Sequence, residues 1–315
     1  MKTALFCLAS AVVLALGCSG PEMNVTDDGG SLTLRRGKDT ILVYNYAVTP
    51  APAGARGVYA RSGYIHPACT PSGFIFTRIQ PEDHLHHYGI WNPWTHIDYQ
   101  GKIYDLWNLR DSLGTVRARS VEAVVEGRRT CGFDAALDHV VYAPEGETVV
   151  ISETWRVRAH DCKDAYVWDF ESEQVPLKDI VLRKYRYQGL CCRGTGLWNK
   201  DNVDIVSSEG LGRDEIDGTT ARWIYCNGDT DKPGGRAGFM FLSHPGNFNH
   251  PEPLRIWDSG QNRGNGDVFI NFSPPKTRDW PMETGKKYTL RYRVVAYDGD
   301  MSPERAEAFW SDYAR

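Results

Sequence analysis

Short runs of alternating apolar and polar residues recur along this chain, and they limit its fold more strongly than any other feature. Between Thr148 and Arg158, apolar residues recur mainly at every second position, which is the period of a β-strand with one face in the core. Residues 287–296 alternate in the same way. A dozen or more such runs are separated by Gly, Pro, Asn and Asp, without long helical periodicity. This pattern predicts an all-β, antiparallel sandwich or barrel.

The number of predicted strands exceeds that of a small immunoglobulin-like domain, so we expect one large antiparallel β-sandwich over residues 33–315. Two sandwiches that divide near residues 158–165 are the alternative. One short C-terminal helix is expected, with Ser302 as its N-cap and Pro303 in its first position. The predicted strands are 41–46, 57–66, 73–79, 120–126, 137–143, 148–158, 165–173, 180–188, 203–207, 220–226, 236–242, 267–272 and 287–296.

The first eighteen residues indicate export. Lys2 precedes an apolar run, residues 4–16, which is too short to span a bilayer as a helix and has the form of a signal peptide. The run ends in Ala-Leu-Gly-Cys, which is similar to the lipobox of bacterial lipoproteins, where the cysteine carries the lipid. We therefore expect residues 1–18 to be a lipoprotein signal peptide and Cys18 to be the lipidated residue.

The polar, Gly-rich residues 19–32 are expected to be a flexible tether between the lipid and the domain. The protein would then be anchored in the bacterial cell envelope, at a periplasmic or outer-membrane face, and would touch the membrane only through its lipid. The net charge of −4 is mild, and the absence of a Lys/Arg run argues against a nucleic-acid partner.

Six cysteines follow Cys18 at irregular spacings, without a Cys-x-x-Cys pair. This pattern argues against an essential disulfide framework and against a structural zinc site. Cys191 and Cys192 are adjacent within an apparent strand, so they are expected to point to opposite faces of a sheet.

Histidines concentrate in one short part of the sequence. Five of the nine histidines fall between residues 66 and 96, around the run Asp83-His84-Leu85-His86-His87. A protein core avoids unpaired imidazoles, and a surface strand does not need them. The density therefore indicates a functional site with at least two of these histidines, and the alternative is that one or two of the rings only form hydrogen bonds to loop carbonyls.

The geometry of an extended chain assigns roles within this run. If the run is a strand, His84, His86 and Tyr88 share one face. Asp83 and His87 then share the other face. This arrangement predicts that His84 and His86 line a pocket while Asp83 or His87 orients a ring from behind.

A metal site is an alternative interpretation of the same run. His84 and His86, with a distant His, Asp or Glu, would resemble the divalent-metal sites of cupin-like β-barrels. Spacing identifies no third ligand. We therefore expect no cofactor, with a divalent metal on these two histidines as the alternative.

Aromatic and hydrogen-bonding side chains surround the histidines. The flat face of a tryptophan stacks on the C–H face of a sugar ring, whose hydroxyls need fixed polar partners. Most tryptophans in a sandwich nevertheless belong to its core. The predicted substrate-binding residues are Arg61, His66, Trp91, Trp94, Trp107, Asn108, Trp198, Lys200, Arg213 and Arg222.

Charged residues also stand beside Gly or aromatic residues later in the chain, including the segment Leu-Arg-Ile-Trp-Asp at 254–258. Glu209 is a candidate general base and His244 a candidate second acid or base. Turn chemistry and surface ion pairs explain any single one of these residues equally well. The predicted catalytic residues are His84, His86, His87, Asp83, Glu209 and His244.

Six segments resemble the PmoA-like family of bacterial proteins: RSGYIHP, PEDHLHHYGIW, WNL, SSEG, SHPGN and LRYRVVAYDG. The resemblance extends over nearly the whole chain after the signal segment. It implies a β-rich domain, often in exported proteins near carbohydrate-handling genes, and no established reaction. The family is named after a subunit of methane monooxygenase, an integral membrane protein. Since no stretch here after residue 18 is apolar enough to span a membrane, we do not expect methane monooxygenase activity.

The histidine-rich run is also similar to a segment of the galactose-mutarotase-like supersandwich proteins, Asn-His-x-His-Gly-Gly, which places a histidine in a sugar pocket. Here Asp83 replaces the Asn and His87 replaces the first Gly. The second acid histidine and the C-terminal glutamate of those proteins have no counterpart in matching context. The resemblance implies a supersandwich-like fold.

The leading hypothesis is a cell-envelope enzyme that acts on carbohydrate, with His84 or His86 as acid or base and Glu209 or Asp83 as its carboxylate partner. Isomerisation, elimination and hydrolysis remain open. The alternatives are a lipoprotein that binds a glycan without catalysis and a metal-dependent, cupin-like enzyme.

Overall fold

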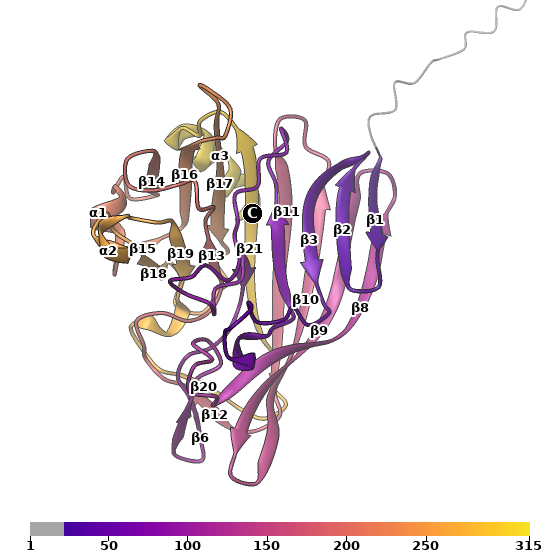
Figure 1. The fold of residues 1–315 in the computed structure, drawn as a ribbon, viewed down its shortest axis with the longest axis vertical. Helices are drawn as coiled ribbons and strands as arrows, with labels where there is room; N and C mark the ends of the chain where they lie inside the picture. The colour runs from indigo at the N-terminus through magenta and orange to yellow at the C-terminus, as the bar shows by residue number, and fades with distance from the viewer. Residues whose placement is uncertain (1–21) are drawn as a thin grey trace, which may run out of the picture.

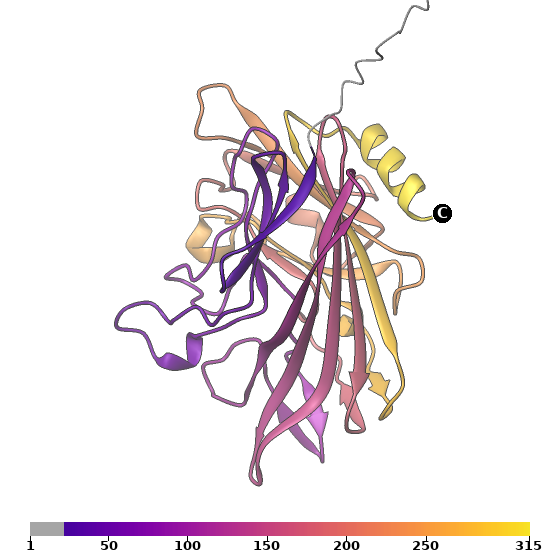
Figure 2. The same cartoon turned by 90° about the vertical axis from the view of Figure 1, so that its right-hand side faces the viewer.

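Antiparallel sheets dominate the structure, a computed structural model that describes residues 22–315. A nine-stranded sheet faces an eight-stranded sheet, and a small four-stranded sheet lies at one end (Figure 1). Figure 2 shows the indigo strands of the first sheet opposite the long magenta and pink strands of the second. This architecture confirms the predicted antiparallel β-sandwich.

The nine-stranded sheet contains, in spatial order, β1 (Met23–Asp27), β2 (Ser31–Arg36), β3 (Asp39–Asn45), β4 (Tyr64–Ala68), β5 (Ile90–Trp91), β13 (Cys191–Arg193), β19 (Phe269–Phe272), β18 (Glu252–Ile256) and β15 (Thr220–Ala221). The eight-stranded sheet contains β14 (Val203–Ser207), β16 (Trp223–Asp229), β17 (Arg236–Ser243), β21 (Tyr288–Asp298), β11 (Tyr166–Pro176), β10 (Gly146–His160), β9 (Thr130–Ala143) and β8 (Gly114–Glu126). The four-stranded sheet contains β20 (Trp280–Met282), β12 (Ile180–Leu182), β6 (Ile97–Tyr99) and β7 (Lys102–Tyr104).

Helices are few and short. The longest is α3 (Pro303–Tyr313), which packs against β16 and β17 on the outside of the eight-stranded sheet (Figure 2). The Ser302 side chain accepts a hydrogen bond from the backbone N–H of Arg305, so the predicted N-cap and C-terminal helix are confirmed. The other helical segments are α1 (Arg213–Ile216), α2 (Gln261–Gly264) and the 3-10 turns η1 (Gly57–Tyr59) and η2 (Pro274–Lys276). No helix within residues 22–315 is long and apolar enough to cross a membrane.

The alternation within β10 produces the expected buried face. Ile151, Trp155 and Val157 enter the core between the two large sheets, while Ser152, Thr154 and Arg156 are partly exposed. A register shift between Val149 and Ile151 also turns Val150 into the core, although simple alternation assigns Val150 to the opposite face. The alternating pattern therefore predicted the strand, whereas the bulge between Val149 and Ile151 changed which side chains are buried near its start.

The predicted tether is corrected over the part that the structure describes. Residues 23–27 and 31–36 form the hairpin β1–β2, and the side chains of Met23 and Leu32 are buried in the main core. The Asp-Gly-Gly segment between them is the turn of this hairpin, where the Asp28 side chain accepts backbone hydrogen bonds. The predicted signal peptide, Cys18 and residues 19–21 lie outside the described residues.

Three of the predicted strands are shorter in the structure than the sequence pattern indicated. Residues 57–66 begin with a 3-10 turn and become a strand only at Tyr64. Residues 73–79 make isolated bridges, and only the first three residues of 180–188 form a strand. These segments contain aromatic and β-branched residues, but their backbones form only isolated bridges or short ladders instead of pairing along their whole length.

Gly89 fixes the backbone where the histidine-rich run joins β5. Its φ of 58° is left-handed, and a Cβ at this position would lie 2.2 Å from the carbonyl oxygen of Ile65. Its N–H donates to the carbonyl oxygen of Arg78, and its own carbonyl accepts from the N–H of Arg193. An alanine here would therefore have to move a strand that carries the site.

We predict that Gly89→Ala lowers the free energy of unfolding by about 3 kcal/mol or more, because backbone strain and a steric clash act together. Gly101→Ala is the matched control, since Gly101 has a φ of 76° but a Cβ added there would meet nothing within 4 Å. The control should lose only about 1 to 2 kcal/mol. Urea denaturation of both variants measures this difference, and equal losses would contradict the assigned backbone constraint.

Candidate functional site

The histidine-rich run covers the outer side of the nine-stranded sheet. Along β5, β13, β18 and β19, one set of residues points into the main core: Ile90, Cys192, Ile256 and Ile270. The alternate residues point outward and lie under the run: Trp91, Cys191, Arg193, Arg255 and Phe269. Cys191 and Cys192 therefore face opposite sides of the sheet, as predicted. The six cysteines within residues 22–315 are free.

The run itself consists of two tight turns and is not the extended strand that we expected. The N–H of His84 donates to the carbonyl oxygen of Pro81, at 2.9 Å, and the N–H of His87 donates to that of His84, at 2.9 Å. The turns replace the alternation of a strand, so all three imidazoles lie together. The ring centroids of His84 and His87, and of His86 and His87, are 4.7 Å apart.

Tyr88 does not share a face with His84 and His86, which corrects the second part of that expectation. Its ring packs against Tyr64 with the centroids 4.8 Å apart, and its hydroxyl donates to the carbonyl oxygen of Tyr59 and accepts from Gln80. Tyr88 is fully buried beside the sheet and closes the end of the second turn.

A buried arginine holds the run in place. Nη2 of Arg193 donates to Asp83 Oδ2 at 2.8 Å and also to Asp267, and the Arg193 side chain is fully buried. Asp267 accepts further hydrogen bonds from Arg78, Asn262 and Asn265. Two carboxylates thus compensate the buried guanidinium, and each fixes one loop above the sheet.

Asp83 also orients a histidine. Its Oδ2 accepts a hydrogen bond from Nδ1 of His84 at 2.7 Å. An ionised carboxylate only accepts hydrogen bonds, so Nδ1 carries the proton and Nε2 of a neutral His84 holds the lone pair. Although burial alone would raise the pKa of the Asp83 carboxyl, the hydrogen bond from His84 and the charge of Arg193 hold this pKa well below its usual range.

The three histidines form one side of a cleft of about 210 Å³. Four aromatic rings, three amide side chains and two arginines complete its walls. The lining residues are His84, His86, His87, Trp107, Asn108, Arg186, Tyr187, Arg255, Trp257, Gln261, Asn262 and Phe269. No carboxylate belongs to this lining, within the part of the chain that the structure describes.

Hydrogen bonds fix the wall opposite the histidines. Oδ1 of Asp105 accepts the backbone N–H groups of Trp107, at 2.8 Å, and of Asn108, at 3.0 Å. Oδ1 of Asn108 accepts the hydroxyl of Tyr187 at 3.1 Å. The aromatic and amide groups of this wall therefore have one defined arrangement.

Burial keeps two of the histidines neutral. It lowers the pKa of His86 to about 3, and the neighbouring His84 and Arg61 act in the same direction. It also lowers the pKa of His87 well below the usual histidine range, and the neighbouring His86 and Arg193 act in the same direction. The ring of His87 stacks on Phe269 with the centroids 5.2 Å apart.

Several residues predicted for the site do meet here. His84, His86, His87, Trp107 and Asn108 line the cleft, and Asp83 stands behind His84. Trp91 lies directly below, fully buried, with its ring centroid 5.1 Å from that of His87. It supports the cleft and does not line it.

Other predicted binding residues belong to the core. Trp94 and Trp198 are fully buried in the main core, where Nε1 of Trp94 donates to Gln174 and Nε1 of Trp198 donates to the carbonyl oxygen of Asp229. His66 shares a hydrogen bond with the Thr77 hydroxyl, and burial lowers its pKa to about 4. Their proximity in sequence to polar residues did not indicate exposure, because the loops that carry Trp94 and Trp198 turn both rings into the main core.

The later polar residues do not converge on the cleft. Arg222 pairs with Glu307 of α3 at 2.7 Å, and the His244 ring contacts Tyr313 of the same helix. Glu209 is exposed in the turn after β14 and accepts a hydrogen bond from the neighbouring Ser208. The predicted grouping of these residues with the histidines is therefore wrong, because β14, β16 and β17 belong to the other sheet.

Lys200, Arg213 and Arg61 lie beside the site without entering the cleft. Nη1 of Arg213 donates to the carbonyl oxygen of Gly266 at 2.7 Å, and the backbone of Lys200 donates to that of Asn265. Both residues thus support the loop that carries Asp267. Arg61 lines a different pocket, between β8 and the segment before β4.

Sequence reasoning missed much of the far wall and the buried network. Arg255 and Trp257 lie in the 254–258 segment, where a charge beside an aromatic residue was the only signal. Arg193 follows from strand alternation, since it shares the outward face of Cys191. No sequence signal pointed to Arg186, Tyr187, Gln261, Asn262 or Phe269, which reach the cleft from distant parts of the chain.

A metal centre was the alternative interpretation of the histidine-rich run. Within residues 22–315, no three His, Cys, Asp or Glu side chains are arranged to hold a metal ion. The three imidazoles pack edge to face and face to face, and Nδ1 of His84 is already hydrogen-bonded to Asp83. The expectation that the site holds no cofactor stays a prediction, with a divalent metal on His84 and His86 as its alternative.

The sequence matches the model of the family of unknown function DUF6807 over residues 31–311. The chain belongs to this DUF6807 family. The family description carries no reaction, and the resemblance to PmoA-like proteins stays a prediction. A search of curated proteins found no match to this DUF6807 chain.

Solved structures of sugar-related proteins are similar to this chain in a coarse way. A galactose mutarotase related enzyme from Lactobacillus acidophilus matches 87% of this chain and 97% of its own, with 10% identity and a TM-score of 0.41. A galactose mutarotase-like protein from Lactobacillus casei matches 87% and 100%, with 10% identity and a TM-score of 0.42. A putative aldose 1-epimerase from Escherichia coli K12 matches 90% and 100%, with 10% identity and a TM-score of 0.35. Sequence identities of 10% and TM-scores below 0.5 do not support the transfer of a function, so the function has to be inferred from the side chains of this chain.

The neutral state of His86 generates a prediction about pH. Its folded pKa is depressed, so its contribution to stability is present above the unfolded value of 6.5 and is lost as the pH falls toward about 3. Between about pH 6.5 and 5 the wild-type protein should lose stability, with His86 contributing up to about 1.4 kcal/mol per pH unit. His86→Gln should show a correspondingly flatter profile in urea denaturation. Identical profiles would mean that the His86 ring is protonated in the folded protein.

Proposed function

We propose that this protein is a carbohydrate-active enzyme of the isomerase or lyase type, and that His84, oriented by Asp83, is its acid–base residue. The hydrogen bond of 2.7 Å between His84 Nδ1 and Asp83 Oδ2, at the edge of an aromatic cleft, is the observation that carries the proposal. A histidine held in this way presents its other ring nitrogen as a proton acceptor.

The walls of the cleft support a sugar as the ligand. Trp257, Trp107 and Tyr187 offer flat apolar faces for the C–H face of a pyranose ring. Asn108, Gln261 and Asn262 supply amide groups for its hydroxyls, and Arg186 and Arg255 supply charged donors. A volume of about 210 Å³ suits one sugar unit rather than a larger cofactor.

The charge distribution favours proton transfer over glycoside hydrolysis. Hydrolysis by the common mechanisms uses two carboxyl groups on either side of the scissile bond. Among the described residues the cleft lining contains none, and Asp83 is engaged with His84 and Arg193. Nε2 of His84 instead takes a proton from a hydroxyl or from an acidic C–H group of the sugar, and Asp83 stabilises the imidazolium that forms.

The neighbouring histidines have a supporting role in this proposal. His86 and His87 are neutral, so they do not compete with His84 for a proton or raise the positive charge around it. Their rings pack against one another and form the wall of the cleft beside the base. We propose that the reaction requires no resident metal.

The cellular setting of this activity follows from the N-terminal sequence. We propose that the enzyme is exported and held in the cell envelope by a lipid on Cys18. The β1–β2 hairpin begins at Met23, so the chain between the lipid and the folded domain would be only a few residues long. Extracytoplasmic carbohydrate would then be the substrate pool.

We predict that His84→Gln lowers kcat by about 10²- to 10⁴-fold and changes ligand affinity only a few-fold. The substitution removes the base, whereas the aromatic and amide side chains that line the cleft are unchanged. Asp83→Asn should lower kcat by a comparable factor, since the amide no longer fixes the tautomer that leaves Nε2 of His84 free to accept a proton. The assays would use neutral hexoses, followed by polarimetry, and oligosaccharides containing uronic acid, followed by the ultraviolet absorbance of an unsaturated product.

His160→Gln is the matched control, because His160 also pairs with a carboxylate, Asp169, at 3.0 Å, but lies at the end of β10 outside the cleft. Its turnover should equal that of the wild type. Unchanged turnover in His84→Gln would overturn the assignment of the base. The wild type could instead bind a sugar without turnover in any assay, with weaker binding by His84→Gln. That result would identify the protein as a glycan-binding lipoprotein.

We predict that Trp257→Ala weakens sugar binding by about two- to tenfold, since stacking on an aromatic ring contributes about 0.5 to 1.5 kcal/mol. Trp310→Ala, on α3, is the control, because this ring packs against Arg222 on the other sheet. The affinity of both variants is measured by isothermal titration calorimetry with the sugar that the wild type binds most tightly. Equal affinities in the two variants would exclude Trp257 from the binding surface.

A further inference from the structure

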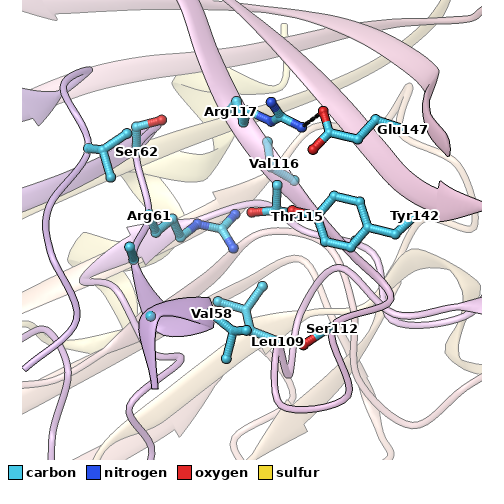
Figure 3. Close-up of a pocket in the computed structure, with 14 residues that line it drawn as sticks. Val58, Arg61, Ser62, Leu109, Ser112, Thr115, Val116, Arg117, Tyr142 and Glu147 are labelled. Carbon is cyan, nitrogen blue, oxygen red and sulfur yellow. Dashed lines mark hydrogen bonds and ion pairs between the residues drawn. The ribbon is translucent and has the colours of Figure 1, made fainter. Parts of the chain in front are cut away.

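A second pocket lies between the edge strand β8 and the irregular segment before β4 (Figure 3). Its volume is about 260 Å³. Residues from the 57–62 segment, from the loop 109–112 and from the adjoining ends of β8, β9 and β10 line it. It shares no lining residue with the histidine cleft.

Arg61 supplies the charge of this pocket. Its side chain is 2% exposed, yet no Asp or Glu among residues 22–315 forms an ion pair with it. Its protein contacts are Nη1 to the carbonyl oxygen of Leu106 at 3.5 Å and the Tyr88 ring, whose centroid is 6.0 Å from Cζ. Nε has no hydrogen-bond partner at all. Burial lowers the pKa of Arg61 to about 10, so the guanidinium remains charged at neutral pH.

An uncompensated buried charge is costly, and proteins normally pair it. Arg193 provides the comparison within this chain, since two carboxylates accept its hydrogen bonds. Arg61 is buried to a similar degree and has no carboxylate of the described part of the chain within ion-pair distance, although the charge of the buried Glu153 favours its charged form. Figure 3 shows its guanidinium extending into the pocket toward Thr115, between the loop residues Leu109 and Ser112 on one side and Arg117 and Glu147 on the other.

The loop that closes the pocket is strained. Leu109 and Ser112 have φ values of 60° and 54°, a left-handed region that residues with a side chain seldom adopt. Both residues line the pocket. Nη1 of Arg56 donates to the carbonyl oxygen of Arg110 at 2.7 Å and thereby ties this loop to the opposite side. Strained backbone of this kind concentrates at ligand sites, where the surrounding structure holds it.

We propose that this pocket is a binding site for a small carboxylate ligand, whose carboxylate pairs with the guanidinium of Arg61. The planar fork of an arginine matches the two oxygens of a carboxylate. The hydroxyls of Thr115 and Tyr142 provide further hydrogen bonds, and Val58 and Leu109 contact the carbon skeleton. The volume accommodates a ligand of the size of a sugar acid. The site is separate from the acid–base cleft and does not depend on the function proposed for it.

The experiment titrates the full-length wild-type protein with sodium acetate and with sodium glucuronate, at constant ionic strength maintained with sodium chloride. Binding is followed by isothermal titration calorimetry, and the melting temperature is followed in parallel. The wild type should bind saturably, with a rise in melting temperature. Arg61→Gln should bind about ten- to a hundredfold more weakly, since a hydrogen bond to a charged group contributes one to two tenfold steps in Kd.

Two further measurements separate binding from folding. Without ligand, Arg61→Gln should be at least as stable as the wild type, because the substitution removes an uncompensated buried charge. Thr115→Val, a near-isosteric change on the edge strand, should weaken carboxylate binding several-fold and leave the unliganded melting temperature unchanged.

Two results would overturn the proposal. One is the absence of saturable binding of either carboxylate to the wild type. The other is equal binding by the wild type, Arg61→Gln and Thr115→Val. If Arg61→Gln is markedly less stable than the wild type and Thr115→Val binds normally, Arg61 is a structural residue of the core and the pocket is not its ligand site.

Discussion

The buried guanidinium of Arg193 is the interaction on which the arrangement of the histidine cleft depends. A charge in this position needs carboxylate partners, and the chain supplies them from two loops that are distant in sequence, at Asp83 and Asp267. The Arg193 guanidinium also lies 4.4 Å from the Trp257 ring. One residue of β13 therefore positions the histidine turns, the loop before β19 and an aromatic wall.

The Asp83 carboxylate pairs with the buried Arg193 and also accepts a hydrogen bond from His84. The same side chain therefore contributes to stability and to the proposed acid–base chemistry. Asp83 Oδ2 accepts from both side chains, so the His84 ring is fixed relative to a rigid sheet rather than to a flexible loop. The orientation of this proposed base does not rely on the hydrogen bonds of a substrate. Arg61, on the other side of the same region, has no such partner, and the contrast between the two arginines is the reason for assigning it a ligand.

Much of the fold followed from the sequence, because strand alternation and helix capping are local. Val157 and Trp155 identified the core face of β10, and Ser302 identified the start of α3. The β1–β2 hairpin was missed because its turn, Asp-Asp-Gly-Gly, has the same composition as a flexible linker. Polarity alone does not distinguish the two, whereas the burial of Met23 does.

The site was predictable in its location and not in its geometry. The density of histidines pointed to residues 84–87, but two reverse turns gave the run a shape that a period of two does not describe. The residues that hold it lie far apart in sequence, since Arg193 is 110 residues from Asp83 and Asp267 is 189 residues from its partner Arg78. Glu209 and His244 had suitable chemistry and failed because sheet topology placed them with β14 and β17.

The central claim is that a sugar occupies the cleft beside His84 and His86. The most direct test is nuclear magnetic resonance of protein labelled with ¹³C at the histidine ring, titrated with neutral hexoses and with uronic acids. We expect the Cε1–H signals of His84 and His86 to move with a common saturation curve, while those of His139 and His160 stay in place. Signals of His84 and His86 that remain unchanged with every sugar, or shifts confined to His160 or His244, would contradict the claim.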